Sequence, residues 1–106
     1  MQNNNKEYFA LKVINNLSLR KEYPKKVYPF TYEGIEMFCY QSSIGQWDAC
    51  EKTTGLPMAI SFTSKIGCMA QTRQIIKSKG RDKSINDIRL AREALNTMDI
   101  YEDDNE

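Results

Sequence analysis

The chain has 106 residues, of which 41% are hydrophobic, and its formal net charge is +1. This length is that of one ordinary domain and the apolar share supports a packed core, so we exclude a disordered chain and expect a single domain over residues 1–106 with flexible tails at 1–5 and 101–106. No apolar run reaches the roughly 20 residues that a membrane span needs, and the N-terminus lacks the features of a secretory signal, so we expect a cytoplasmic protein that does not interact with membranes.

The first predicted element covers residues 6–17. Tyr8, Leu11 and Ile14 follow the spacing of one face of a helix. Apolar and polar residues also alternate over residues 9–13, which would suit a strand. We predict a short N-terminal helix here, with a strand as the alternative.

The next part of the chain has the pattern of strands and turns. The two prolines of residues 20–29 exclude a helix, so this segment is expected to be a connector that leads into an edge strand over residues 27–31. A tight turn is predicted at Glu33-Gly34. Three more strands are predicted from their β-branched and aromatic content, at residues 35–41, 46–52 and 56–61.

Two amphipathic helices are predicted to follow. Thr63 or Ser64 is placed to cap the first, and Gly80 is placed to end it after Lys79. Ser84 is predicted to begin the second helix. The expected fold is therefore α+β, an antiparallel meander of three to four strands with an N-terminal helix and two C-terminal helices packed on it.

The chain lacks the commonest general base of enzymes and a recognisable phosphate-binding loop. It contains no histidine and no glycine-rich phosphate loop. Cys68 lies near a predicted helix start, where the helix dipole could activate a thiol, but a small core residue is the favoured interpretation. We therefore expect a protein that is not an enzyme and that holds neither a metal nor another cofactor.

The remaining cysteines and acidic residues support this expectation. Cys39, Cys50 and Cys68 match no metal-binding spacing, and we expect free thiols, with a Cys39–Cys50 bridge as the alternative. Glu36, Asp48 and Glu51 could form a carboxylate cluster on neighbouring strands. We interpret them as separate charges on the surface of the sheet, because no acidic loop fixes a ligand geometry.

The best binding signal is a segment in which lysine and arginine alternate with aromatic residues. It covers residues 20–32 and includes Lys25, Lys26 and Tyr28. Such a pattern suits nucleic acid, because bases stack on aromatic rings while cations meet phosphates. The alternative is a solvated connector whose aromatic residues turn inward.

Two further candidate binding features lie outside this segment. Trp47 is the only tryptophan and is either an exposed anchor for a partner or a core aromatic residue. A basic run over residues 65–83 is either a solvated corner or a docking patch for an acidic partner. Its candidate contact residues are Arg73, Lys77, Lys79 and Arg81.

Residues 32–79 resemble small accessory proteins of phages and other mobile elements, some of which are anti-CRISPR proteins that inhibit host defence. The features that carry the resemblance are Tyr32-Glu33-Gly34, Trp47 with Glu51, Thr54-Gly55 and the basic helix that follows. The resemblance implies a compact protein that occupies the surface of a host macromolecule. Our leading hypothesis is thus an interaction protein that binds and modulates or inhibits a host protein, and the alternative is a nucleic-acid-binding module that uses residues 20–32 and 65–83. The oligomeric state is not defined by the sequence.

Overall fold

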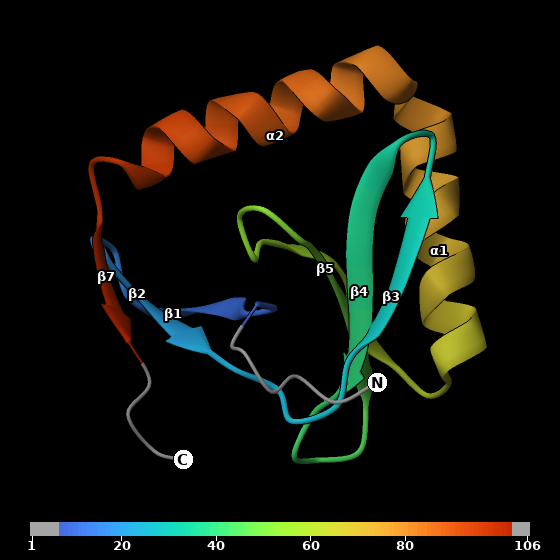
Figure 1. The fold of residues 1–106 in the computed structure, drawn as a ribbon, viewed down its shortest axis with the longest axis horizontal. Coiled ribbons are helices and arrows are strands. Elements are labelled where there is room, and N and C mark those ends of the chain that lie inside the picture. Colours follow the sequence, from blue (N-terminus) through green and yellow to red (C-terminus); the bar gives the residue numbers. More distant parts are fainter. Residues whose placement is uncertain (1–6, 103–106) are drawn as a thin grey trace.

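The computed structural model describes residues 7–102, which form two β-sheets and two helices (Figure 1). The first sheet has the strand order β1-β2-β7 and consists of β1 (Ala10–Asn15), β2 (Ser18–Glu22) and β7 (Asp99–Glu102). The second sheet has the order β3-β4-β5-β6 and consists of β3 (Tyr28–Tyr32), β4 (Ile35–Gln41), β5 (Trp47–Glu51) and β6 (Pro57–Phe62). The helices are α1 (Lys65–Lys79) and α2 (Arg81–Leu95).

The predicted N-terminal helix is wrong, because residues 10–22 form the antiparallel hairpin of β1 and β2. The side-chain oxygen of Asn15 accepts a hydrogen bond from the backbone N–H of Leu17 at 2.9 Å, which favours a turn where a helix would have to continue. Ile14 and Leu17, which would lie on the buried face of that helix, are exposed. The alternative interpretation, a strand, is the correct one.

The expected layout of a single sheet is also wrong, because β7 adds a parallel strand to β2. Tyr101 and Glu102 belong to this strand and are not part of a loose tail. Residues 1–5 and 103–106, the rest of the two predicted tails, lie outside the described residues. The antiparallel meander of the second sheet, in contrast, follows the predicted strands closely.

Helix α1 begins and ends as predicted. The hydroxyl of Ser64 accepts the backbone N–H of Gly67 at 3.0 Å, and the N–H of Gly80 is bonded to the carbonyl of Ile76 at 2.8 Å. Helix α2 begins at Arg81 and not at Ser84, whose hydroxyl bonds to the carbonyl of Gly80 from within the first turn.

The two faces of the second sheet are covered by different parts of the chain. Successive residues of a strand point to opposite faces, so Cys39 packs against Cys68 of α1 while Phe38 packs against Ala10 of β1. Cys39 pairs with Ala49 across the two strands, and Cys50 pairs with Phe38, which places the two thiols on opposite faces. A Cys39–Cys50 bridge is therefore excluded, and all three cysteines are free and buried.

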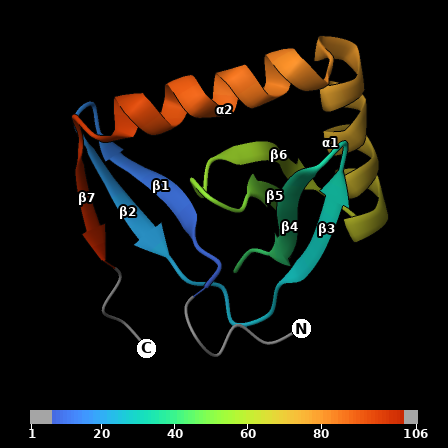
Figure 2. The ribbon, with the colours of Figure 1, turned by 45° about the horizontal axis from the view of Figure 1, so that its top comes forward.

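Helix α2 does not pack along the sheet as predicted. It runs from the end of α1 across to the first sheet (Figures 1 and 2). Ser84 is its one buried residue, and Leu90 is 48% exposed. Among the described residues, no helix is long and apolar enough to cross a bilayer.

Candidate functional site

An open groove lies where the connector between β2 and β3 meets the ends of β4 and β5. Its volume is about 470 Å³. Cations, aromatic rings and small polar groups share its wall, and we call it the lysine–aromatic groove. Its lining residues are Glu22, Tyr23, Pro24, Lys25, Lys26, Tyr28, Tyr40, Gln41, Ser42, Ser43 and Trp47.

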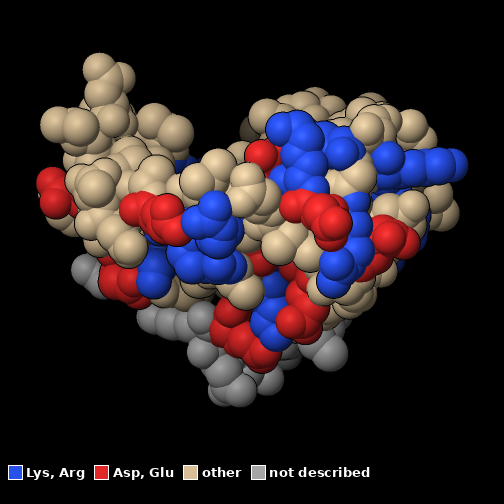
Figure 3. Space-filling model, turned by 90° about the horizontal axis from the view of Figure 1, so that it is seen from above, with Lys and Arg blue, Asp and Glu red and all other residues tan. Residues whose placement is uncertain are grey.

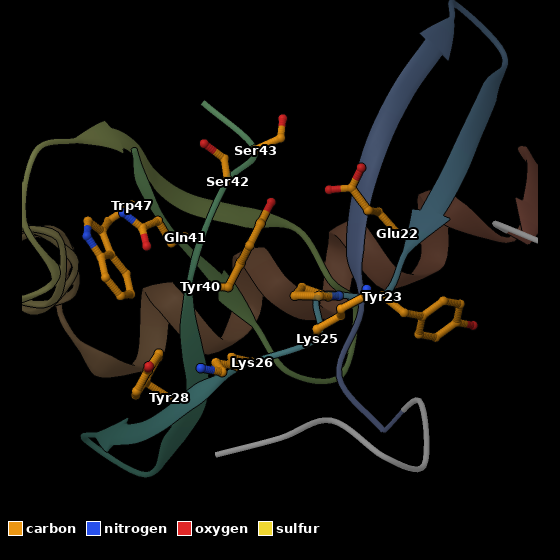
Figure 4. Close-up of a pocket in the computed structure, with 11 residues that line it drawn as sticks. Glu22, Tyr23, Lys25, Lys26, Tyr28, Tyr40, Gln41, Ser42, Ser43 and Trp47 are labelled. Carbon is orange, nitrogen blue, oxygen red and sulfur yellow. The ribbon is translucent and has the colours of Figure 1, made fainter. Parts of the chain in front are cut away.

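Four of the eight predicted site residues meet in this groove. Lys25, Lys26, Tyr28 and Trp47 all line it, although Trp47 lies on β5 and the other three on β3 or the connector before it. Figure 4 shows Trp47 and Tyr28 on one side of Tyr40, with the lysines of the connector nearer to the hairpin. The fold thus joins the basic-aromatic segment and the single tryptophan into one surface.

Trp47 is neither fully exposed nor fully buried in the core. Its ring meets that of Tyr28 edge to face, with 5.6 Å between the ring centres, and packs on the core cluster around Cys39. It remains half-buried and lines the groove. The ammonium group of Lys65, in the first turn of α1, lies 4.1 Å from the ring centre of Tyr28 and forms a cation–π contact with this ring.

Lys25 and Lys26 are the free charges of the groove. Both are exposed, and their ammonium groups form no ion pair or hydrogen bond with another residue between 7 and 102. The next residue, Val27, is fully buried, and Pro24 restricts the backbone on the other side. Two cations without an ion-pair partner among residues 7–102 therefore lie on a connector whose backbone is restricted on both sides.

A partly buried polar network borders the groove. Lys12 of β1 donates a hydrogen bond to the hydroxyl of Tyr40 at 2.6 Å and lies 3.8 Å from the carboxylate of Asp48 and 4.0 Å from that of Glu22. Burial raises the pKa of the Tyr40 phenol well above its ordinary value, and the nearby Cys50 and Asp48 add to the effect. The phenol thus stays neutral and serves as a fixed polar wall rather than as an acid or a base.

The groove continues into a second hollow of about 370 Å³ on the other side of this network. The two share Glu22, Ser42 and Ser43. Asp48 lines the second hollow, where one of its carboxylate oxygens also accepts the backbone N–H of Ser61 at 2.9 Å. The combined surface therefore has free cations at one end and carboxylates at the other.

The four predicted residues of the basic helix lie elsewhere, and three of them already have partners. The guanidinium of Arg73 lies 5.8 Å from the ring centre of Phe30, and Lys79 forms an ion pair with Asp87 at 3.0 Å. Arg81 donates to the backbone carbonyl of Glu33 at 3.0 Å. Lys77 is the exception, being exposed and without an ion pair in the part of the chain that the structure describes.

The side of the molecule that carries α2 has no patch of one sign. Figure 3 shows acidic and basic side chains interspersed across this face. Arg89 and Glu93 are 2.7 Å apart on α2, and Lys83 lies 3.8 Å from Asp87. On this side, Asp87 therefore compensates two lysines of the predicted basic run, Lys79 and Lys83.

The thiols are not activated. Burial raises the pKa of Cys39 and of Cys50 to about 12, and it also raises the pKa of Cys68. The side chain of Cys68 points from α1 into the core. The cost of desolvating a thiolate there outweighs any stabilisation of the thiolate by the helix dipole. The interpretation of Cys68 as a small core residue is the one that agrees with the structure.

The three acidic residues of the predicted sheet surface do not form a cluster, and the prediction of surface charges is wrong for Asp48 and Glu51, which are buried. Glu36 is exposed and lies 3.7 Å from Lys52, while Asp48 belongs to the network that borders the groove. Glu51 is buried and accepts four groups of the next turn, the N–H and hydroxyl groups of Thr53 and Thr54, at 2.6–2.9 Å. Within residues 7–102, no three acidic or cysteine side chains are arranged to hold a metal ion.

Tyr40, Lys12 and Lys65 are among the residues of the site that the sequence did not predict. Tyr40 could have been found from its strand, because it shares a face with Phe38. Lys12 could not, since it reaches Tyr40 only because residues 10–15 form a strand. Lys65 follows the helix cap, but nothing in its neighbourhood in the sequence indicates a contact with Tyr28.

No family model, curated protein or solved structure matches the chain.

Proposed function

We propose that the protein works by binding and that the lysine–aromatic groove holds an acidic segment of a partner protein. The observation that carries this proposal is the meeting of Lys25, Lys26, Tyr28 and Trp47 in one open groove. Tryptophan and tyrosine are enriched where binding energy concentrates, and two uncompensated lysines favour a carboxylate-bearing partner.

The acidic residues of the groove favour a protein partner over nucleic acid. Glu22 lines both hollows and Asp48 lines the second, where Lys12 is already paired with both carboxylates, so an extended polyanion would find no free lysine there after its first contacts with Lys25 and Lys26. A peptide segment can place a carboxylate against the lysines, an apolar side chain against the rings and a cation or amide near Glu22. A mixed ligand of this kind satisfies the whole surface.

The biological setting follows from the resemblance of residues 32–79 to accessory proteins of mobile elements. On this proposal the partner is a host protein, whose activity is modulated or inhibited because its surface is occupied. The buried thiols, with their raised pKa values, support a role without covalent chemistry.

Charge reversal at the groove tests the proposal. In a pull-down from a host lysate, Lys25→Glu with Lys26→Glu is expected to lose a partner that the unchanged protein retains, because both free cations become repulsive. Lys77→Glu is the matched control, since Lys77 is an exposed lysine on α1 outside the groove. Equal retention of every partner by the double variant, or equal loss with Lys77→Glu, would contradict the proposal.

Single-stranded nucleic acid is the second candidate, because Lys25, Lys26 and Tyr28 come from one segment that alternates cations with rings. Trp47 reports on the groove as the only tryptophan of the chain, so its fluorescence can be titrated with an oligothymidylate and with a glutamate-rich peptide that carries one aromatic residue. Binding of the oligonucleotide that weakens steeply with salt, without binding of the peptide, would favour this candidate and overturn the first.

A further inference from the structure

The C-terminal part of the chain, residues 81–102, holds to the rest of the molecule at few points. We call this part, α2 together with β7, the C-terminal arm. Along α2, Ile88 packs on the core beside Ile76, and Arg92 donates a hydrogen bond to the hydroxyl of Thr53 at 2.6 Å. Most of the helix is exposed as it crosses between α1 and the first sheet (Figure 2). Near α1 the arm is held by Arg81, which donates to the carbonyl of Glu33, and by the ion pair of Asp87 with Lys79, and its remaining attachment is at its far end.

Strand β7 makes the attachment at that end. It pairs in parallel with β2, and the N–H of Asp99 bonds to the carbonyl of Leu17 at 3.0 Å. The carboxylate of Glu102 accepts the hydroxyl of Tyr23 at 2.6 Å and lies 3.5 Å from Lys21. All of these groups belong to β2 or to the residues next to it, so β7 of a second copy could make the same contacts.

A single residue links the arm to α1. Gly80 lies between the two helices with φ +90° and ψ 151°, in a region that is essentially restricted to glycine. A Cβ atom at this position would have no heavy atom within 4 Å, so it is the backbone conformation, and not a close approach, that requires glycine here. If Gly80 took helical angles, α1 and α2 would form one continuous helix, which would carry β7 away from its own β2.

We propose that the C-terminal arm is exchangeable between two copies of this chain, so that β7 of each copy pairs with β2 of the other. We call the monomer in which β7 pairs with its own β2 the closed form. Only a second copy of the chain can offer β7 every contact of the closed form, and the reciprocal exchange gives a dimer with two-fold symmetry. Tyr23 lines the lysine–aromatic groove, so in the dimer the carboxylate bound to it, that of Glu102, comes from the other copy. This inference does not depend on what the groove binds.

Cross-linking between two single variants tests the exchange. Arg20 and Tyr101 are register partners across β2 and β7, so Arg20→Cys on a tagged chain and Tyr101→Cys on an untagged chain can form their disulfide only between two copies. After joint incubation near the unfolding midpoint, cooling and oxidation, a mixed disulfide-linked dimer is expected on a non-reducing gel. Lys83→Cys, mixed with Arg20→Cys, controls for random collision, because Lys83 is an exposed residue of α2. The native thiols are buried and do not compete.

Substitution of Gly80, the residue that links the arm to α1, provides a second, independent measurement. Gly80→Ala strains the closed form and favours the continuous helix, so its dimer fraction in light scattering is expected to rise about tenfold or more at equal concentration. Gly45→Ala is the matched control, since Gly45 also has a positive φ, of +86°, but lies in the loop before β5. Circular dichroism verifies that each variant is folded. A Gly80→Ala protein that stays monomeric, together with a mixture that gives no more cross-link than the Lys83→Cys control, would overturn the proposal.

Discussion

At the scale of single residues, Gly55 shows how one backbone conformation holds the two sheets together. Its φ is +74°, and its carbonyl accepts the backbone N–H of Leu11 in β1 at 2.8 Å. A Cβ atom there would lie 2.7 Å from ring atoms and from the carbonyl oxygen of Phe9. Glycine is thus required both by the angle and by the approach of the N-terminal segment.

We predict that Gly55→Ala lowers the free energy of unfolding by about 2 to 4 kcal/mol, because backbone strain and the clash with Phe9 add together. Urea unfolding followed by Trp47 fluorescence measures the loss. Gly45→Ala is the control: it has a comparable φ, its nearest neighbour lies 4.0 Å away, and about 1 kcal/mol of strain is expected. Equal losses in the two variants would show that the contact with Phe9 contributes nothing.

The residues of the site were predictable where local chemistry marks them. Lys25, Lys26 and Tyr28 stand out from their neighbours, and Trp47 is unique in the chain. Their meeting point was not predictable, because it depends on how β5 lies beside the connector. Lys12 and Tyr40 form their 2.6 Å bond across 28 residues of sequence, and no local pattern indicates such a pair.

At the scale of elements, β3 is an edge strand that carries a proline at its exposed side. Glu33 and Gly34 have φ of +53° and +76°, as a two-residue hairpin turn requires, and Tyr32 pairs with Ile35 beside it. Along β3 and β4, hydrogen-bonded residue pairs alternate with pairs that are not hydrogen-bonded, starting from the bonded pair of Tyr32 and Ile35. The backbone nitrogens of Thr31 and Pro29 therefore point away from β4, to the free edge of β3. Pro29 has no N–H, which removes one of the donors that another strand would use.

We predict that Pro29→Val increases self-association, because it restores that donor on the open edge. Size-exclusion chromatography and static light scattering over a concentration series measure the change. Thr31→Val is the control, since it places the same side chain two residues on, where an edge N–H is already present. If both variants associated to the same degree, the added valine side chain, and not the restored N–H at the edge of β3, would be the cause.

The elements with strong local signals were predicted well. β4 spans Ile35–Gln41 as expected, and α1 is bounded by Ser64 and Gly80. Residues 6–17 were mispredicted because helical and alternating patterns coincide there, and the turn formed by Asn15 decides between them. β7 has only four residues, all of them exposed, in an acidic stretch, and it becomes a strand through its pairing with β2.

At the scale of the whole molecule, one core cluster joins the two sheets. Ala10 of β1 packs with Phe38 and Tyr40 of β4, with Cys50 of β5 and with Val27 of the connector. A separate cluster joins α1 to the opposite face through Cys39 and Cys68. Because β4 contributes to both clusters, neither sheet can lose its packing without affecting the other.

We predict that the described part of the chain unfolds in one cooperative transition, and that Phe38→Ala destabilises both sheets together by about 3 to 5 kcal/mol. Trp47 fluorescence reports on the second sheet, and hydrogen exchange of the amides of β1 and β2 reports on the first. Ile44→Ala is the control, because Ile44 is 77% exposed and should change neither signal. A first sheet that opens at lower urea than the second would contradict the prediction.

The pairing of β2 with β7 has a consequence for synthesis on the ribosome. Tyr23 and Glu102, which are bonded in the finished protein, stand 79 residues apart in the sequence. The β1–β2 hairpin therefore leaves the exit tunnel before the strand that completes its sheet, and its outer edge stays open until β7 has also been made and released. Nascent chains waiting side by side on a polysome would be most vulnerable to wrong pairing at this edge.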